Sequence, residues 1–174
     1  MKKMIYPVAA LFIIAASAFT IYQAQGWKIG ENYTVKFTSS DPSGVFTGLK
    51  GTINFDEKNL AASNFDVSID VASINTGNGT QNSHAKSAQW FDAEKFPLIK
   101  FTSSAITKTA TGYEAKGTLE MHGVQKEAVI PFTFKDNTFT GSFDVNREDF
   151  GLNPSNGRAG KVIKVDLVVP VTKA

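Results

Sequence analysis

The sequence predicts an all-β protein, an antiparallel barrel or sandwich of eight strands with one short helical segment between two of them. Residues 65–71 alternate apolar side chains with Asp or Ser, and residues 163–169 show the same alternation. This pattern is typical of a strand with one wet face. Short turn signals, such as Asp41-Pro42-Ser43-Gly44 and Asp136-Asn137, separate most of the runs. Such spacing favours antiparallel neighbours.

Eight segments have the composition and alternation of strands, with threonine, valine and phenylalanine frequent among them. The segments are 31–39, 45–56, 63–74, 97–107, 111–121, 124–135, 138–148 and 161–172. The exception is 75–97, where His84, Ser87, Ala88 and Phe91 fall at helical spacing before Pro97. We therefore expect a short helical connection there, lying across one end of the sheet.

The stretch 118–134, TLEMHGVQKEAVIPFTF, combines a histidine and several charges with apolar residues. Two alternating runs end at Met121 and begin at Val124, so only His122 and Gly123 lie between them. Two-residue hairpin turns require positive φ, which glycine adopts freely and histidine tolerates better than most residues. His122 is therefore predicted to be a turn residue and not a catalytic base.

The N-terminus has the form of a secretory signal peptide over residues 1–18. Lys2 and Lys3 precede an apolar run to Ile21, and Ala16-Ser17-Ala18 resembles a cleavage site. The alternative is an uncleaved membrane anchor, because no charge occurs between Lys3 and Lys28. The chain has no cysteine, which excludes disulfides and a lipoprotein anchor. We expect one domain, placed at 27–174, in the periplasm or secreted.

The motifs of common enzymes and nucleic-acid-binding proteins are absent from the sequence. Without residues 1–18 the chain has 16 Lys and Arg against 16 Asp and Glu, and no basic run follows Lys3. No nucleic-acid partner, metal or cofactor is therefore expected. The remaining catalytic hypothesis, a hydrolase or isomerase, pairs His84 with Asp149 of the run Arg147-Glu148-Asp149. Because adjacent side chains of a strand point apart, a structural role is favoured for that run.

The apolar faces of the predicted strands converge on one interior. A closed sheet of eight strands has room for packed side chains or for one slender ligand, and periodicity does not separate these alternatives. A membrane-spanning barrel is a further alternative, but clear paired girdles of aromatic residues are missing.

Four motifs in order resemble the YceI-like family of exported bacterial proteins. They are FDVSIDVASINTGN at 65–78, HAKSAQWFDAEKFPLIKF at 84–101, GTLEMHGVQK at 117–126 and NREDFGL at 146–152. The resemblance runs from Trp27 to the C-terminus. It implies an eight-stranded lipocalin-like β-barrel that holds a polyisoprenoid or similar amphipathic lipid, without catalytic activity. Gln81-Asn82 stand where the family often has Arg-Asp, so a quinone or a fatty acid derivative stays an open alternative.

The resulting expectation is a carrier or storage protein for a long-chain isoprenoid, and a homodimer is an open expectation. Trp90, Phe91 and Phe101 are expected near the lipid tail, and His84 and Arg147 near its head group. The alternative for these residues is simple core packing, as in an envelope stress or scaffold protein with a filled barrel. The full set of predicted ligand-binding residues is Phe37, Phe55, Phe65, Val67, Ile69, His84, Trp90, Phe91, Ile99, Phe101, Phe143 and Arg147.

Overall fold

The computed structural model describes residues 23–152 and 160–174. The predicted signal peptide at 1–18 lies outside the described residues. The strands are β1 (Gly26–Ile29), β2 (Thr34–Thr38), β3 (Gly44–Phe46), β4 (Leu49–Asn54), β5 (Asn64–Asp70), β6 (Ile74–Asn75), β7 (Leu98–Lys108), β8 (Tyr113–Met121), β9 (Val124–Lys135), β10 (Thr138–Asn146) and β11 (Val162–Lys173). One α-helix, α1 (Gly79–Lys86), and three 3₁₀ turns, η1 (Leu60–Ala62), η2 (Val71–Ser73) and η3 (Arg147–Phe150), complete the description.

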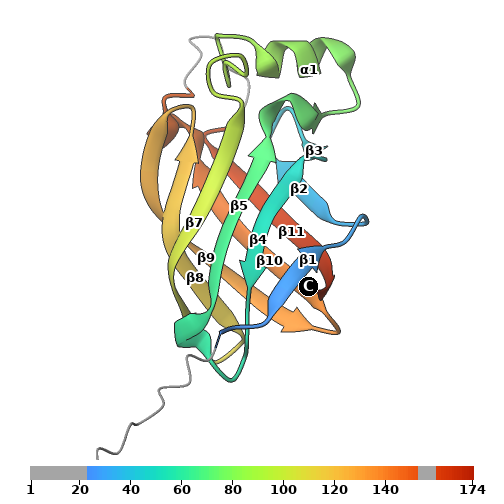
Figure 1. Ribbon diagram of the computed structural model, residues 1–174. Helices are drawn as coiled ribbons and strands as arrows, with labels where there is room; N and C mark the ends of the chain where they lie inside the picture. The colour runs from blue at the N-terminus through green and yellow to red at the C-terminus, as the bar shows by residue number, and fades with distance from the viewer. Residues whose placement is uncertain (1–22, 153–159) are drawn as a thin grey trace, which may run out of the picture.

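The strands close into an antiparallel barrel with eight strand positions (Figure 1). Long hairpins join β7 to β8, β8 to β9 and β10 to β11. The other edge of β11 pairs with β2 at Lys164 to Val168 and with β1 at Val171 to Lys173, so β1 and β2 share one position. β1 in turn pairs with β4, which closes the ring. The predicted eight-stranded barrel is confirmed.

Two predicted strands are interrupted where the barrel wall bends. The segment 45–56 breaks at Thr47-Gly48 into β3 and β4, and 63–74 becomes β5, η2 and the short β6. A side chain at Gly48 would meet the Cβ of Asp70 at 2.6 Å. The Oγ of Ser73 accepts hydrogen bonds from the backbone N–H groups of Thr47 and Gly48, at 3.2 and 3.0 Å.

Tyr33 bridges the same break from the neighbouring strand position. Its hydroxyl donates to the carbonyl of Thr47 and accepts from the N–H of Leu49, which lies at 3.0 Å. These side chains thus form hydrogen bonds with backbone groups that have no strand partner at the break.

β1 is a further difference from the prediction, because residues 26–29 precede the predicted first strand at 31–39.

A helical connection lies across the upper end of the barrel as predicted, but α1 ends at Lys86, before the Ser87, Ala88 and Phe91 that the prediction placed at helical spacing (Figure 1). The side chain of Asn78 caps the helix by accepting from the N–H of Gln81 at 3.1 Å. Beyond Lys86 the chain continues in hydrogen-bonded turns, in which Phe91 N–H donates to the carbonyl of Ala85 at 3.0 Å. Within the described ranges, no helix is both long enough and apolar enough to cross a bilayer.

The turn at His122-Gly123 is confirmed. Met121 pairs with Val124, and the two turn residues have φ of 53° and 74°. The imidazole lies against the helical connection, with its ring centre 4.8 Å from that of Phe96 and its Nδ1 3.2 Å from the carbonyl oxygen of Phe150. His122 therefore links the β8–β9 turn to the helical connection through Phe96 and to η3 through Phe150.

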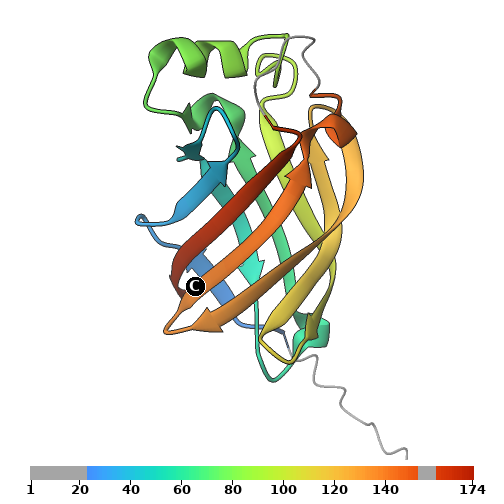
Figure 2. The same ribbon diagram turned by 180° about the vertical axis from the view of Figure 1, so that it is seen from behind.

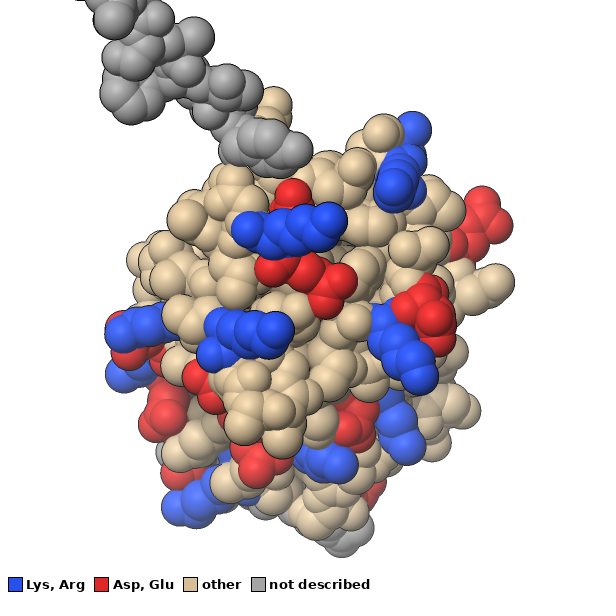
Figure 3. All heavy atoms as spheres, turned by 90° about the horizontal axis from the view of Figure 1, so that it is seen from below, with Lys and Arg blue, Asp and Glu red and all other residues tan. Residues whose placement is uncertain are grey.

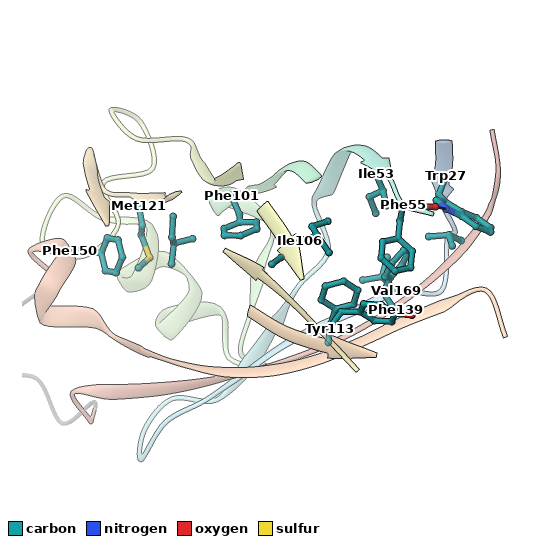
Figure 4. Close-up of a cluster of buried hydrophobic side chains, with 14 of the residues drawn as sticks. Trp27, Ile53, Phe55, Phe101, Ile106, Tyr113, Met121, Phe139, Phe150 and Val169 are labelled. Atoms are coloured by element: carbon teal, nitrogen blue, oxygen red, sulfur yellow. Dashed lines mark hydrogen bonds between the residues drawn. The ribbon is translucent and has the colours of Figure 1, made fainter. Parts of the chain in front are cut away.

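Aromatic side chains close the opposite, lower end (Figure 4). Phe55 is 1% exposed, and Trp27 donates from its indole N–H to the carbonyl of Phe55 at 2.9 Å. Tyr113 and Phe139, labelled in the same view, are two of the rings that surround Phe55. Seen from below, acidic and basic side chains are interspersed over this end, with no large area of one sign (Figure 3).

Candidate functional site

The barrel is not filled, because a cavity of about 570 Å³ lies above the aromatic floor. Its walls consist of the inward side chains of the alternating strands, as the pleat requires. On β11 these are Ile163, Val165, Leu167 and Val169, which lie opposite Val145, Phe143, Gly141 and Phe139 of β10. The cavity is therefore largely apolar along its length.

The floor of the cavity is a set of aromatic rings. Phe65, Phe132 and Phe139 line it. Phe55 lies behind them, with its ring centre 6.3, 5.6 and 5.4 Å from theirs. Two of these three contacts are edge-to-face, an arrangement that aromatic pairs prefer, and the contact with Phe65 is tilted. The cavity is consequently blind at the lower end of the barrel.

The upper end of the cavity is more polar. Ser39, Asp41, Gln81 and His84 line it, from the β2–β3 loop and from α1. Gln81 Nε2 donates to Asp41 Oδ1 at 3.3 Å, which links the helix to the loop. These hydroxyl, carboxylate, amide and imidazole groups offer hydrogen bonds to a polar molecular end.

Asn82 has a different role from Gln81. Its Oδ1 accepts from the backbone N–H and the hydroxyl of Thr76, each at 2.8 Å. This fixes the start of α1 to the loop that follows β6. At Gln81 and Asn82, where the family that the sequence resembles often has a charged pair, this chain uses neutral side chains to hold the helix in place.

Arg147 is the buried cation of the site, with 6% of its surface exposed. Its Nε donates to the carbonyl of Gly160 at 3.0 Å, and Nη1 donates to the carbonyl of Leu152. The guanidinium carbon lies 5.5 Å from the ring centre of Trp90, a cation–π distance. Arg147 therefore ties η3 and the start of β11 to the helical connection while it lines the cavity.

The structure brings most of the predicted site residues together. Eleven of the twelve line the cavity, and whether they contact a ligand stays a prediction. Phe55 is the exception, because it is buried behind the floor and does not line the cavity. The eleven are Phe37, Phe65, Val67, Ile69, His84, Trp90, Phe91, Ile99, Phe101, Phe143 and Arg147.

Several lining residues were not among the predicted site residues. Alternation in 124–135 places Ile130 and Phe132 on the interior face, so the signal was present in the sequence. Leu152 lies outside the predicted strands, and only the tertiary structure brings it to the cavity, while Phe46 in the predicted strand 45–56 was missed. The strand ends at Met121 and Val145 were likewise missed.

The hypothetical His84–Asp149 pair is not assembled. His84 lines the cavity from α1, whereas Asp149 does not line the cavity and accepts a hydrogen bond from Asn146 Nδ2 at 3.4 Å. In the part of the chain that the structure describes, no group of three or more His, Asp or Glu side chains is placed to hold a metal ion. The geometry favours a binding cavity over an acid–base site.

Comparisons with known proteins agree with this architecture. Protein YceI of Escherichia coli O17:K52:H18 is 29% identical over 138 residues, which are 74% of this chain and 71% of the relative. The crystal structure of Burkholderia cenocepacia BcnA is 25% identical and superposes with a TM-score of 0.75, covering 83% of this chain and 99% of that one.

A third similar structure is a domain from Saccharophagus degradans described as polyisoprenoid-binding. It is 15% identical, with a TM-score of 0.64 over 86% of this chain and 99% of that one, and at this identity it supports the fold. The model of the YceI-like domain matches residues 26–171, which is most of the chain. The chain therefore belongs to the YceI-like family.

Proposed function

We propose that this protein binds a polyisoprenoid or similar long-chain amphipathic lipid in its barrel cavity and carries or stores it without chemical change. The observation that carries the proposal is the blind apolar cavity inside a closed barrel. Its volume of about 570 Å³ falls in the range of pockets that bind small molecules.

Burial of the lipid tail supplies the binding free energy in this proposal. Removing apolar surface from water contributes about 25 cal/mol for each Å². A tail lying along β10 and β11 contacts Phe143, Val165 and Leu167 and ends against the floor at Phe139. No specific hydrogen bond is needed along this part of the ligand.

The polar end of the lipid is placed at the upper end of the cavity. Gln81 and His84 offer donors there, and Ser39 and Asp41 offer acceptors. Arg147 already donates to the carbonyls of Gly160 and Leu152. These partners suit a head group that forms a few hydrogen bonds, such as a hydroxyl or a quinone.

The family and the fold support the ligand class. The Saccharophagus degradans domain, which has this fold, is described as polyisoprenoid-binding.

The proposal also includes export to the periplasm or outside the cell, based on the composition of residues 1–18, and a homodimer. The scaffold alternative called for a filled barrel, and the cavity does not favour it.

The direct test is native mass spectrometry of the protein purified from cell envelopes, followed by organic extraction of the bound molecule. We expect a complex heavier than the chain by one lipid, and release of a prenyl chain. Uptake is measured in parallel with all-trans-retinol, a fluorescent isoprenoid alcohol, by energy transfer from Trp90 and Trp27.

Two adjacent residues of β11 provide a matched pair for this assay. Leu167 lines the cavity, whereas Val168 points outward and is 41% exposed. Leu167→Glu and the apolar, cavity-filling Leu167→Trp are both expected to abolish retinol uptake, and Val168→Glu to leave it unchanged. A folded wild-type protein that neither retains nor takes up lipid contradicts the proposal.

A further inference from the structure

β9 and β10 are hydrogen-bonded neighbours over only part of their lengths. Their ladder contains four residue pairs, from Thr138 opposite Lys135 to Gly141 opposite Phe132. On their other edges, β9 pairs with β8 and β10 pairs with β11 through nine residue pairs each. Figure 2 shows the two strands meeting at the lower end and diverging toward the upper end.

Pro131 gives a physical reason for the position at which the ladder ends. The next pair would place Ser142 opposite Pro131, which has no N–H to donate. Above this point, the described residues show no backbone ladder between 124–131 of β9 and 142–146 of β10. The upper part of the wall is therefore not closed by backbone hydrogen bonds at this position.

A depression of about 500 Å³ occupies the region between the diverging strands. We call it the lateral window. Three of its residues, Leu119, Phe143 and Val145, also line the cavity, so the two spaces share part of their lining. The residues of the lateral window are Leu119, Lys126, Glu127, Ala128, Val129, Phe143, Asp144, Val145, Asn146, Asp149 and Phe150.

Lys126 shows that water reaches the interior face of β9 here. It pairs with Leu119 of β8, so the two side chains lie on the same, inward face of the sheet. Leu119 is 7% exposed, yet Lys126 is exposed and lines the lateral window. A lysine on the interior face of a closed barrel wall would have to be desolvated, and this one is not.

From this geometry we propose that the lateral window is a second opening of the cavity, through which the lipid enters and leaves. The inference rests on the proposed lipid binding. The upper end is covered by α1, which Gln81 holds to Asp41. A tail that passes sideways between β9 and β10 can move past Phe143 while the polar end stays in water beside Lys126, so exchange does not require displacement of α1.

The opening is tested without any ligand by thiol labelling, because the chain has no cysteine. Phe143 and Val165 are paired on neighbouring strands, both line the cavity, and only Phe143 lines the lateral window. We expect Phe143→Cys to react with a bulky maleimide about ten-fold faster than Val165→Cys. Equal rates would mean that the upper end is the common entrance and would overturn the inference.

The route is tested by bridging each opening and measuring retinol release into phosphatidylcholine vesicles. Val129→Cys with Asp144→Cys spans the lateral window, and Asp41→Cys with Gln81→Cys spans the upper end. Each double variant is compared after reaction with a short bis-maleimide and after blocking with N-ethylmaleimide. We expect the window bridge to slow release about ten-fold relative to its own blocked form, and the upper bridge, whose residues also line the head-group end, to slow release by a smaller factor.

The opposite result, with slow release only when the upper end is bridged, would overturn the route. If the wild-type protein carries no extractable lipid and takes up no retinol, the proposed function fails. The labelling ratio of Phe143→Cys to Val165→Cys still decides in that case whether the lateral window is open.

Discussion

Phe55 is the buried residue against which the rings of the aromatic floor pack. Its ring contacts five others with centre distances of 5.1 to 6.3 Å, and four of these five contacts are edge-to-face or close to it. Aromatic pairs of this kind contribute about 0.5–1.5 kcal/mol each beyond the area they bury. Phe55 therefore sets the lower limit of the cavity through packing, although it does not line the cavity itself.

Replacing Phe55 with alanine is expected to lower the free energy of unfolding by about 3–5 kcal/mol, the usual cost of emptying a fully packed phenylalanine site. Phe143→Ala is the control, because Phe143 already borders empty space, and its cost should be clearly smaller. Urea denaturation measures both. Equal costs would show that the floor is no better packed than the cavity wall.

Tyr113 has an altered ionisation at the same end of the barrel. Its hydroxyl donates to Glu57 Oε1 at 2.6 Å. This hydrogen bond, helped by burial and by the negative charge of Glu57, raises the pKa of Tyr113 from 10.0 to about 12. The folded protein therefore keeps this proton at pH values where the unfolded chain loses it.

The stability contribution of this pair is expected to be complete below pH 10 and to be lost as the pH rises toward 12. Glu57→Gln removes the charge and should return the pKa of Tyr113 toward 10.0. The ultraviolet absorbance of ionised tyrosine, followed against pH, measures this, with Tyr113→Phe to assign the transition. Identical curves for the wild type and Glu57→Gln would contradict the assignment.

The turns of the barrel depend on contacts with elements distant in sequence. His122-Gly123 has the backbone of a two-residue hairpin, and the same turn is packed beneath Phe96. A Cβ at Gly123 would lie 2.5 Å from the ring of Phe96. Gly77 also has a positive φ, of 77°, but no atom lies within 4 Å of its would-be Cβ.

Alanine substitutions at these two glycines distinguish the stability cost of backbone strain from that of a steric clash. Gly77→Ala is expected to cost about 1 kcal/mol, the left-handed penalty of an L-residue. Gly123→Ala should cost at least about 1 kcal/mol more, because Phe96 must also move. Thermal unfolding of the two variants measures the difference. If both variants lose the same stability, the contact between the turn and the helical connection is unimportant.

The closed barrel combines a closely packed lower part with a hollow upper part. The lower part is dense in aromatic contacts, and the cavity lies between it and α1. Such a distribution maintains an empty interior, because the floor and the long hairpins stabilise the fold without filling the cavity. A ligand that binds only this folded arrangement must stabilise it.

Retinol is therefore expected to raise the free energy of unfolding with concentration, by about 2.7 kcal/mol at one hundred times its dissociation constant. Urea denaturation at several retinol concentrations measures this. Leu167→Trp is the control and should show no dependence on retinol, since its side chain occupies the site. A concentration dependence that Leu167→Trp retains would place retinol outside the cavity.

The alternation of residues predicted the strands and part of the cavity wall, and the family resemblance implied the closed barrel. A strand pleat sends every second side chain inward, so Val67 and Ile69 were predicted as interior residues without knowledge of the topology. The two-residue turn at His122 followed from local backbone preferences in the same way. Local patterns of this kind are encoded within a few neighbouring residues.

The breaks in the wall, the floor and the lateral window required the tertiary structure. The split between β3 and β4 depends on Tyr33 and Ser73, which are 14 or more residues from the groups they bind. Pro131 in the sequence does not reveal which strand it faces. Periodicity in the sequence shows which face of a strand a side chain occupies. The size of a cavity depends instead on the distance between opposite walls of the barrel, and that distance is set only when all eight strand positions close into a ring.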